Sequence, residues 1–277
     1  MERPIVEKSA TSGLRKFSLL KEDPGRYLMR AVLAGMYLSI VVLVYWSLLN
    51  NMHDTPFGKV LASLFFGVGL SVIVFTNSEL FTSNNMYLAV SSAEGKTTWL
   101  QTVAVWAVCY LGNLIGAIVL TTLLYFAGVL DSLPPEHALN VGAVHKAEQT
   151  AQVIFFKGIL ANWVVCLAVW VALHLKEDLA KIVAIILVVF IFLYLGFEHS
   201  IANMGTFSMA LASHGGLTFG QAVFNLIFST LGNVVGGAVF VGLVYRYLSP
   251  EAMDQAEAAE AARQLTPQRK APNAAAH

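Results

Sequence analysis

The sequence is poor in charged residues, which make up 12% of its 277 positions. A soluble domain usually carries about a quarter, so a soluble enzyme or binding domain is excluded. Cysteine is nearly absent, and Cys109 and Cys166 lie in apolar stretches, where free thiols that pack in the core fit better than a disulfide. The formal net charge is zero, so the charge balance points to no partner, and we expect neither a nucleic-acid partner nor a cofactor.

Apolar residues dominate instead, at 57% with a mean hydropathy of +0.66. A membrane-spanning helix needs about 20 mostly apolar residues. Six stretches qualify: 27–49, one from 59 interrupted at 76–85, 99–130, 151–175, one from 179 interrupted at 198–200, and 220–248. We expect an all-α polytopic membrane protein with six transmembrane helices, the second and fifth of them broken.

The segments outside the spans predict three parts and one orientation. Residues 1–26 form an N-terminal segment without a signal peptide, 27–248 form the membrane domain, and 249–277 form a polar tail with a short solvated helix and a disordered end. Six spans place both termini on one side, and 14 of the 17 lysines and arginines lie on that side. The positive-inside rule therefore predicts a cell-membrane protein with both termini in the cytoplasm.

The chain repeats itself at an offset of about 120 residues. The stretch "LGNLIGAIV" (111–119) matches "LGNVVGGAV" (231–239), and Glu79 in the first break matches Glu198 in the second. Because three spans per half give the halves opposite orientations, this pattern predicts a 3+3 inverted repeat. The glycines within the echo also fit ordinary close packing of helices.

The two breaks predict a shared central site. A helix interrupted in mid-membrane is tolerated only where it is buried in protein or lines a wet cavity. Glu79 and Glu198 are expected to hold the breaks together by satisfying freed backbone groups. Three asparagines are candidate caps of the half-helices that follow: Asn84, Asn85 and Asn203.

His199 lies inside the second break, and a histidine in mid-span usually faces a cavity. One interpretation is a neutral imidazole with both nitrogens hydrogen-bonded. The other uses its ability to exchange a proton near neutral pH. An anion crosses an apolar constriction at high free energy, whereas its protonated acid is neutral. His199 is therefore a candidate proton shuttle for a small weak acid, which is proton transfer without covalent chemistry.

Three motifs resemble the signatures of the formate/nitrite transporter family: "SELFTSNN" (78–85), "GILANWVVCLAVW" (158–170) and "GFEHSIANM" (196–204). The resemblance runs from about residue 5 to residue 250. It implies an aquaporin-like protomer within a homopentamer, and a pore through each subunit for small monovalent anions or their acids. Substrates in this family are formate, nitrite, hydrosulfide and, in some members, lactate.

The resemblance also implies roles for individual residues. His199 resembles the central pore histidine, Thr82 the pore-loop threonine that faces it, and Asn162 an asparagine that bonds near the histidine. Lys146 resembles a lysine at the outer mouth that attracts anions. The constriction positions are Leu70, Leu80 and Phe81 on one side, and Phe66 and Phe192 on the other. Plain core packing is the alternative for these five.

This chain departs from the family pattern at Asn77 and Ser83, where glycine is common, so we expect a stiffened or reshaped pore loop. Apolar residues among basic ones in 12–26 predict an interfacial helix near the cytoplasmic mouth.

Rival classes fit less well. A water channel of the aquaporin type is disfavoured because the sequence contains no Asn-Pro-Ala triplet. A metalloenzyme is disfavoured because no HExxH motif or cysteine pair is present, so we expect neither an enzyme nor a metal site. An ion-coupled secondary transporter stays open, since the same repeat serves pumps and channels. Formate is the first choice of substrate and nitrite the second, ahead of lactate and hydrosulfide.

Overall fold

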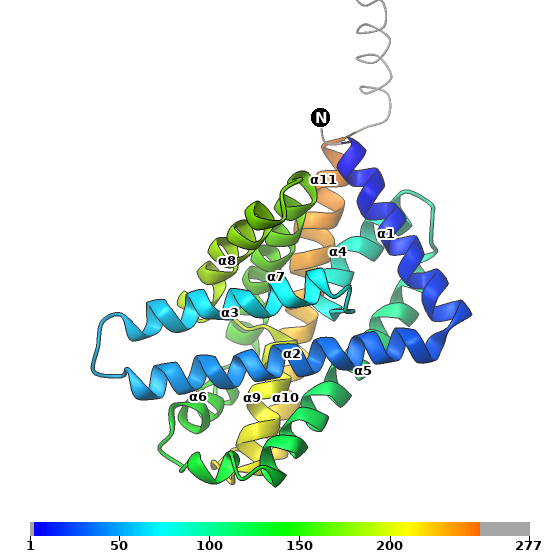
Figure 1. The fold of residues 1–277 in the computed structure, drawn as a ribbon. Helices are drawn as coiled ribbons and strands as arrows, with labels where there is room; N and C mark the ends of the chain where they lie inside the picture. The colour runs from blue at the N-terminus through cyan, green and yellow to red at the C-terminus, as the bar shows by residue number, and fades with distance from the viewer. Residues whose placement is uncertain (1–2, 250–277) are drawn as a thin grey trace, which may run out of the picture.

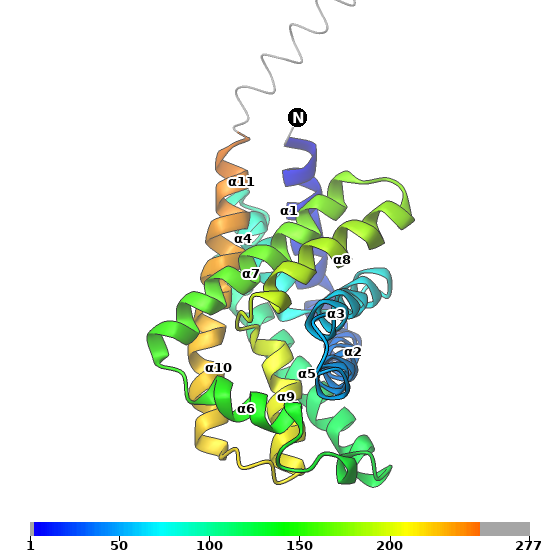
Figure 2. The same ribbon diagram turned by 90° about the vertical axis from the view of Figure 1, so that its left-hand side faces the viewer.

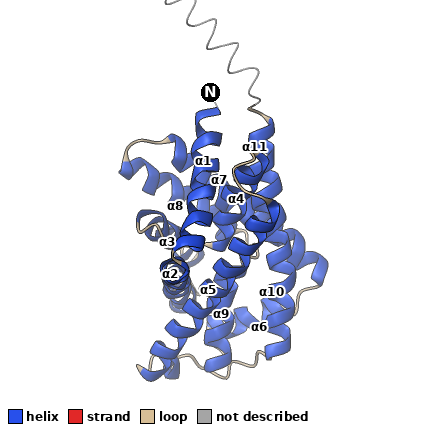
Figure 3. Cartoon of the chain, turned by 90° about the vertical axis from the view of Figure 1, so that its right-hand side faces the viewer, coloured by secondary structure: helices blue, strands red, loops and turns tan. Residues whose placement is uncertain are grey.

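The computed structural model describes residues 3–249, so the predicted tail from residue 250 onward lies outside the described residues. Within 3–249 the regular structure is entirely helical (Figure 3), which confirms the all-α prediction. The α-helices are α1 (Arg3–Glu22), α2 (Pro24–Asn51), α3 (Gly58–Phe75), α4 (Phe81–Ala93), α5 (Trp99–Phe126), α6 (Ala138–Ala147), α7 (Ala151–His174), α8 (Asp178–Tyr194), α9 (Ser200–Ala212), α10 (Phe219–Val234) and α11 (Val244–Tyr247). A 3-10 turn (Leu130–Ser132) precedes α6, and a π-helical segment (Val235–Leu243) joins α10 to α11.

The helices follow the predicted spans closely. Among the described residues, five helical runs are long and apolar enough to cross a membrane: α2, α3, α5, α7 and the continuous run Phe219–Tyr247. The interrupted stretches appear as the pairs α3/α4 and α8/α9. The first break, at 76–80, is shorter than the expected 76–85, whereas the second, at 195–199, starts earlier and is longer than the expected 198–200. The total of six spans and the opposite orientation of the two halves stay predictions.

Both breaks begin with the same C-terminal helix motif. After α3, Ser78 N–H donates to Ile73 O and Asn77 N–H donates to Val74 O. After α8, Phe197 N–H donates to Phe192 O, with Gly196 in the left-handed position at φ 70°. Asn77 holds the equivalent position at φ 53°. This is a Schellman motif, in which asparagine is the usual substitute for glycine, so Asn77 makes the same turn in the first break as Gly196 makes in the second.

Helices α5 and α10 also match. Each begins with a capping box, formed by Thr98 with Gln101 and by Thr218 with Gln221. Each packs against one partner at very short range, α5 on α2 and α10 on α7 (Figures 1 and 2). A Cβ added to Gly116 would collide with Val32 O, and one added to Gly236 with Ile159 O. The echoed glycines therefore allow these helix pairs to approach closely.

Helix α1 lies beside α11 at the end of the molecule that holds the N-terminus (Figures 1 and 2). Glu94, in the loop after α4, joins the two helices: Arg3 Nη2 lies 2.6 Å from Glu94 Oε2 and Arg246 Nε 2.9 Å from Glu94 Oε1. The Glu94 side chain is 5% exposed. The N-terminal segment therefore contains a helix, which starts and ends earlier than the expected 12–26 and is held in place by a shared carboxylate. Its position at a membrane surface stays a prediction.

Acidification is expected to loosen this end of α1. Burial alone would raise the pKa of Glu94, but hydrogen bonds and charge from Arg3 and Arg246 outweigh it and hold the pKa below its ordinary value of 4.5. Because the pKa is lowered in the folded chain, the stabilisation is present above about pH 4.5 and is lost as the pH falls through the lower folded value. Amide hydrogen exchange in α1 should accelerate over that range. In the Glu94→Gln variant, the amides of α1 should exchange fast already at neutral pH, and the rate should respond little to acid. The Asp54→Asn variant, which changes an exposed residue, should behave like the parent.

Candidate functional site

The two breaks meet at the centre of the molecule. Helix α4 is N-capped by Leu80 and α9 by His199, both in extended backbone. The two residues line one cavity of about 10 Å³, which is room for about one water. The other lining side chains are apolar and include Phe66, Leu70 and Phe192. We call this cavity the central chamber; His199 is the one polar group on its wall.

The hydrogen bonds of His199 define its tautomer. The Ala202 backbone N–H donates to Nδ1 at 3.1 Å, so Nδ1 carries no proton. The ring proton is therefore on Nε2, which lies 3.0 Å from Thr82 Oγ1 and donates to it. The imidazole also stacks on Phe192, with 5.6 Å between ring centroids. The structure thus holds His199 neutral, with both nitrogens bonded.

Asn162 connects the pore loop to the last span. Its Nδ2 lies 3.1 Å from Thr82 O, 3.1 Å from Asn85 Oδ1 and 2.7 Å from Asn233 O. Cys166, one helical turn later, donates to the same Thr82 carbonyl at 3.3 Å. Asn162 therefore acts on the histidine indirectly, by fixing the backbone that carries Thr82.

In each break, one asparagine from the neighbouring span bonds a backbone carbonyl and a backbone N–H. Asn113 on α5 donates to Ala31 O and Glu79 O and accepts from Phe81 N–H. Asn233 on α10 makes the matching set: it donates to Gly158 O and Glu198 O and accepts from Ser200 N–H. Sequence reasoning assigned this task to the glutamates and missed both asparagines. The signal was present, since each is the polar third residue of an echoed "LGN" triplet.

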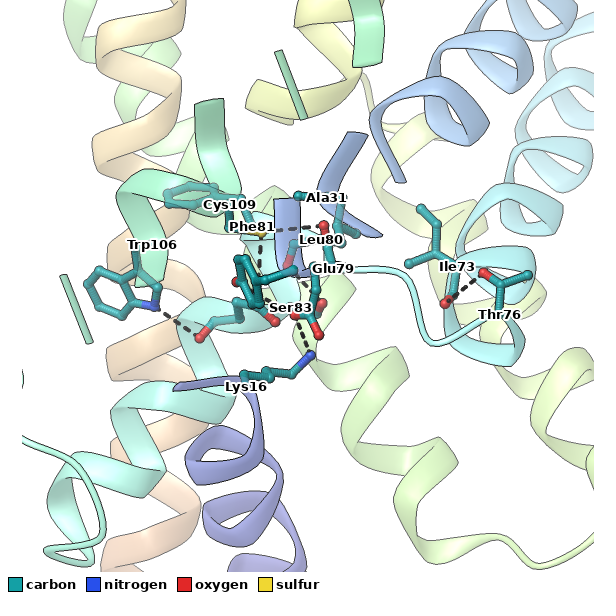
Figure 4. A network of polar contacts seen from close by, with 12 residues as sticks. Lys16, Ala31, Ile73, Thr76, Glu79, Leu80, Phe81, Ser83, Trp106 and Cys109 are labelled. Carbon is teal, nitrogen blue, oxygen red and sulfur yellow. Dashed lines mark hydrogen bonds and ion pairs between the residues drawn. The ribbon is translucent and has the colours of Figure 1, made fainter. Parts of the chain in front are cut away.

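The glutamates instead form two buried ion pairs. Lys16 Nζ lies 2.7 Å from Glu79 Oε2 (Figure 4), and Lys146 Nζ lies 3.0 Å from Glu198 Oε1. The carboxylates also accept from the amides of Asn84 and Asn203. Lys16, on α1, was not predicted. Lys146, predicted as an anion attractor, is engaged with Glu198.

Removing the lysine of one pair is expected to destabilise the protein strongly. Lys146→Met leaves the Glu198 side chain, 1% exposed, without its cation. Breaking a buried pair from one side typically costs about 3–5 kcal/mol. Thermal unfolding in detergent should show a large loss for Lys146→Met and a smaller one for Lys146→Met combined with Glu198→Gln. Lys181→Met is the control, because its partner Asp178 is 70% exposed and surface pairs contribute about 0–1 kcal/mol. Equal losses for the two lysine variants would contradict a charged Glu198.

Two larger cavities lie on either side of the central chamber. One, of about 490 Å³, is bordered by α1 and Glu79, and we call it the α1 vestibule. The other, of about 520 Å³, is bordered by α6 and Glu198, and we call it the α6 vestibule. A cavity of about 30 Å³ shares Phe66, Phe192 and His199 with the chamber and Lys146 with the α6 vestibule. The cavities form a row closed by apolar side chains at the chamber.

Most predicted site residues come together here. Leu70, Leu80, Phe66, Phe192 and His199 line the chamber. Phe81 does not line it; its ring packs edge-on against Tyr110 at 5.0 Å.

The expected asparagine caps are wrong. The cap positions are held by Leu80 and His199, while Asn84, Asn85 and Asn203 lie inside α4 and α9. There they brace the ion pairs and Asn162 rather than the helix ends. Ser83, in the first turn of α4, donates to Leu80 O and lines the α1 vestibule.

Comparison with known proteins gives a consistent result. A family model described as formate/nitrite transporter matches residues 3–247. The nitrite transporter NirC of Escherichia coli K12 is 35% identical over 251 residues, covering 89% of this chain and 92% of NirC. The formate channel FocA of the same strain is 34% identical over 238 residues, covering 78% of this chain and 83% of FocA.

Solved structures agree. A chain described as an FNT family ion channel superposes with a TM-score of 0.85 at 32% identity, covering 90% of this chain and all of its own length. A pentameric formate channel with formate bound superposes with a TM-score of 0.72 at 32% identity, covering 83% of this chain and 99% of that one.

Proposed function

Because the chain belongs to the formate/nitrite transporter family, we propose that it is a membrane channel for small monovalent anions or their weak acids, with formate as first substrate. Membership makes it a multi-pass membrane transport protein and not an enzyme. The observation that carries the proposal is the row of cavities, in which His199 is the one titratable side chain on the wall of a closed, apolar chamber.

The chamber disfavours a bare anion. Moving a charge into an apolar site without partners is strongly unfavourable, and the wall offers only the His199 ring and the N-terminal ends of α4 and α9. Those ends carry partial positive charge, which attracts an anion. The imidazolium form of His199 would then give one proton to the anion and return to the neutral ring, and the resulting neutral acid would pass the apolar constrictions.

Proton exchange is coupled to the helix cap in this arrangement. Neutral His199 donates a hydrogen bond from Nε2 to Thr82, and a second proton on Nδ1 has to displace the Ala202 N–H. Formation of the imidazolium therefore requires the start of α9 or the ring itself to shift. The same movement would widen a chamber that is too small for a three-heavy-atom ion.

Nitrite is the alternative substrate, since NirC and FocA are similar to this chain to almost the same degree. Both ions are small, bent and singly charged. Lactate is bulkier, and it and hydrosulfide rank below them. A proton-coupled secondary transporter of the same substrates is the other alternative. Zero-current potentials in planar bilayers distinguish it from a channel: a fixed stoichiometry of protons to anions would favour the transporter and contradict the channel.

The assembly and orientation belong to this proposal. A related formate channel is pentameric, and we propose a homopentamer in the cell membrane with a pore in each protomer. The lysine and arginine distribution supports cytoplasmic termini, which makes the α1 vestibule the cytoplasmic entrance and the α6 vestibule the outer one.

Flux into liposomes tests the function. Purified protein is reconstituted, and uptake of formate, nitrite, lactate and hydrosulfide is compared at pH 5 and pH 7. We expect the largest flux for formate and faster uptake at the lower pH, where more acid and more imidazolium form. A larger nitrite flux would select the alternative substrate, and absence of flux for all four would reject the proposal.

A further inference from the structure

The α1 vestibule contains two arginines that the pore mechanism leaves unused. Arg15 on α1 and Arg30 on α2 both line this cavity of about 490 Å³. Neither has an acidic partner among residues 3–249. Lys16 and Glu79 line it too, but they bond each other. With three cations against one carboxylate, the charged lining sums to +2, carried by the two free guanidinium groups.

The α6 vestibule is built differently, although its lining also holds three cations and one carboxylate. Lys146 pairs with Glu198, and Lys157 bonds Gln149 at 2.9 Å. Lys59 lies over the ring of Tyr194, 4.9 Å from its centroid. Every lysine that lines the α6 vestibule is engaged, whereas Arg15 and Arg30 in the α1 vestibule have no acidic partner within residues 3–249.

Guanidinium chemistry indicates the ligand class. The planar fork of arginine matches carboxylate and phosphate oxygens with two parallel hydrogen bonds, which lysine does not. The α1 vestibule adds polar side chains from Ser12, Asn77 and Ser83. Its volume lies within the range typical of small-molecule sites, about 300–1,000 Å³, and far exceeds the size of formate.

We propose that Arg15 and Arg30 form a binding site for a small oxyanion with two negative charges, such as a dicarboxylate or hydrogen phosphate. Two charges match the net +2 of the lining, and the oxygens of such an ion can engage one guanidinium fork on each helix. The bound dianion bridges α1 to α2. Since Ser78, Glu79 and Ser83 border the same cavity, it also sits over the entrance to the chamber; that it thereby slows transport rests on the proposed function.

Binding is tested on the full-length protein in detergent by isothermal titration calorimetry with succinate, inorganic phosphate and acetate. We expect succinate or phosphate to bind at least about tenfold more tightly than acetate, and the two dianions distinguish the carboxylate from the phosphate source. Arg15→Gln and Arg30→Gln should each weaken dianion binding about tenfold or more. Arg30→Lys, which keeps the charge but loses the fork, should weaken it partly.

Arg26→Gln is the matched control, because Arg26 is 67% exposed, pairs with Asp23 and lies outside the cavity lining. Unchanged thermal unfolding of the ligand-free variants shows that they fold. Equal affinity for acetate and the dianions, or equal losses in the Arg26 and Arg15 variants, would overturn the site. Dianion binding without formate flux would refute the proposed function alone, and flux without dianion binding would refute this site alone.

Discussion

Replacing His199 by asparagine is expected to weaken the pH dependence of formate uptake, leaving only the part that comes from protonation of formate in solution. Uptake at pH 5 should fall by at least about tenfold, because a positioned proton donor typically contributes about a hundredfold or more. Asparagine is a strong N-cap residue, so its Oδ1 can accept from the Ala202 N–H as His199 Nδ1 does at 3.1 Å. The variant therefore keeps the start of α9 but loses the titrating ring, together with its bond to Thr82 and its stacking on Phe192. Uptake is measured in proteoliposomes between pH 5 and 8.

The control for this variant is His53→Asn, which removes a histidine whose side chain is 72% exposed and outside the chamber lining. Its pH profile should match that of the parent. A His199→Asn protein whose acid flux still rises toward pH 5 as in the parent would exclude the histidine from proton exchange. Equal unfolding temperatures of parent and variant would show that the cap survived.

The breaks were predictable because polarity is expensive inside a span. Glu79 and Glu198 stand out in apolar stretches of the sequence, and their spacing repeats. Their chemical surroundings were less accessible. A carboxylate in a break fits both a bond to the backbone and a bond to a lysine, and only the structure shows Lys16 and Lys146 as the partners.

Asn113 and Asn233 were missed for a related reason. In the sequence, each asparagine lies beside a glycine, and close packing of helices at that glycine was enough to account for the repeated stretch. No separate role was therefore assigned to the asparagine. Lys16 was missed because α1 looked like a surface helix, whereas it carries one half of a buried ion pair. The family resemblance placed Phe81 in the constriction beside Leu80, but at the start of α4 the two side chains diverge and only Leu80 reaches the chamber.

The π-helical segment Val235–Leu243 had no sequence signal, and it breaks the match between the halves, since α5 is regular throughout. Segments of this kind are often found at functional sites. Here the segment places Gly237 against the side chain of Asn162. Asn162 in turn holds Thr82 O and Asn233 O. The backbone of the last span thus fixes the position of Thr82 opposite His199.

Gly237→Ala is expected to disturb this arrangement. The added Cβ would lie 2.5 Å from Asn162 Nδ2, 2.9 Å from Cys166 Sγ and 3.0 Å from Asn85 Cβ, so at least one of them has to move. Overpacking of this kind typically costs about 1–3 kcal/mol. Asn162 holds Thr82 in place through the bond from Nδ2 to Thr82 O. Formate flux should therefore fall, and its pH profile should change, by more than the loss of stability explains.

Gly220→Ala is the matched control for this prediction, since nothing lies within 4 Å of a Cβ at that position near the start of α10. Alanine there should leave flux unchanged and stabilise the helix by up to about 1 kcal/mol. Thermal unfolding in detergent and proteoliposome uptake at pH 5 and 7 are measured on both variants. A Gly237→Ala protein with the parent's pH profile and a lower unfolding temperature would reduce Gly237 to a packing residue. An altered profile at unchanged protein yield would show that the π-helical segment positions the pore loop.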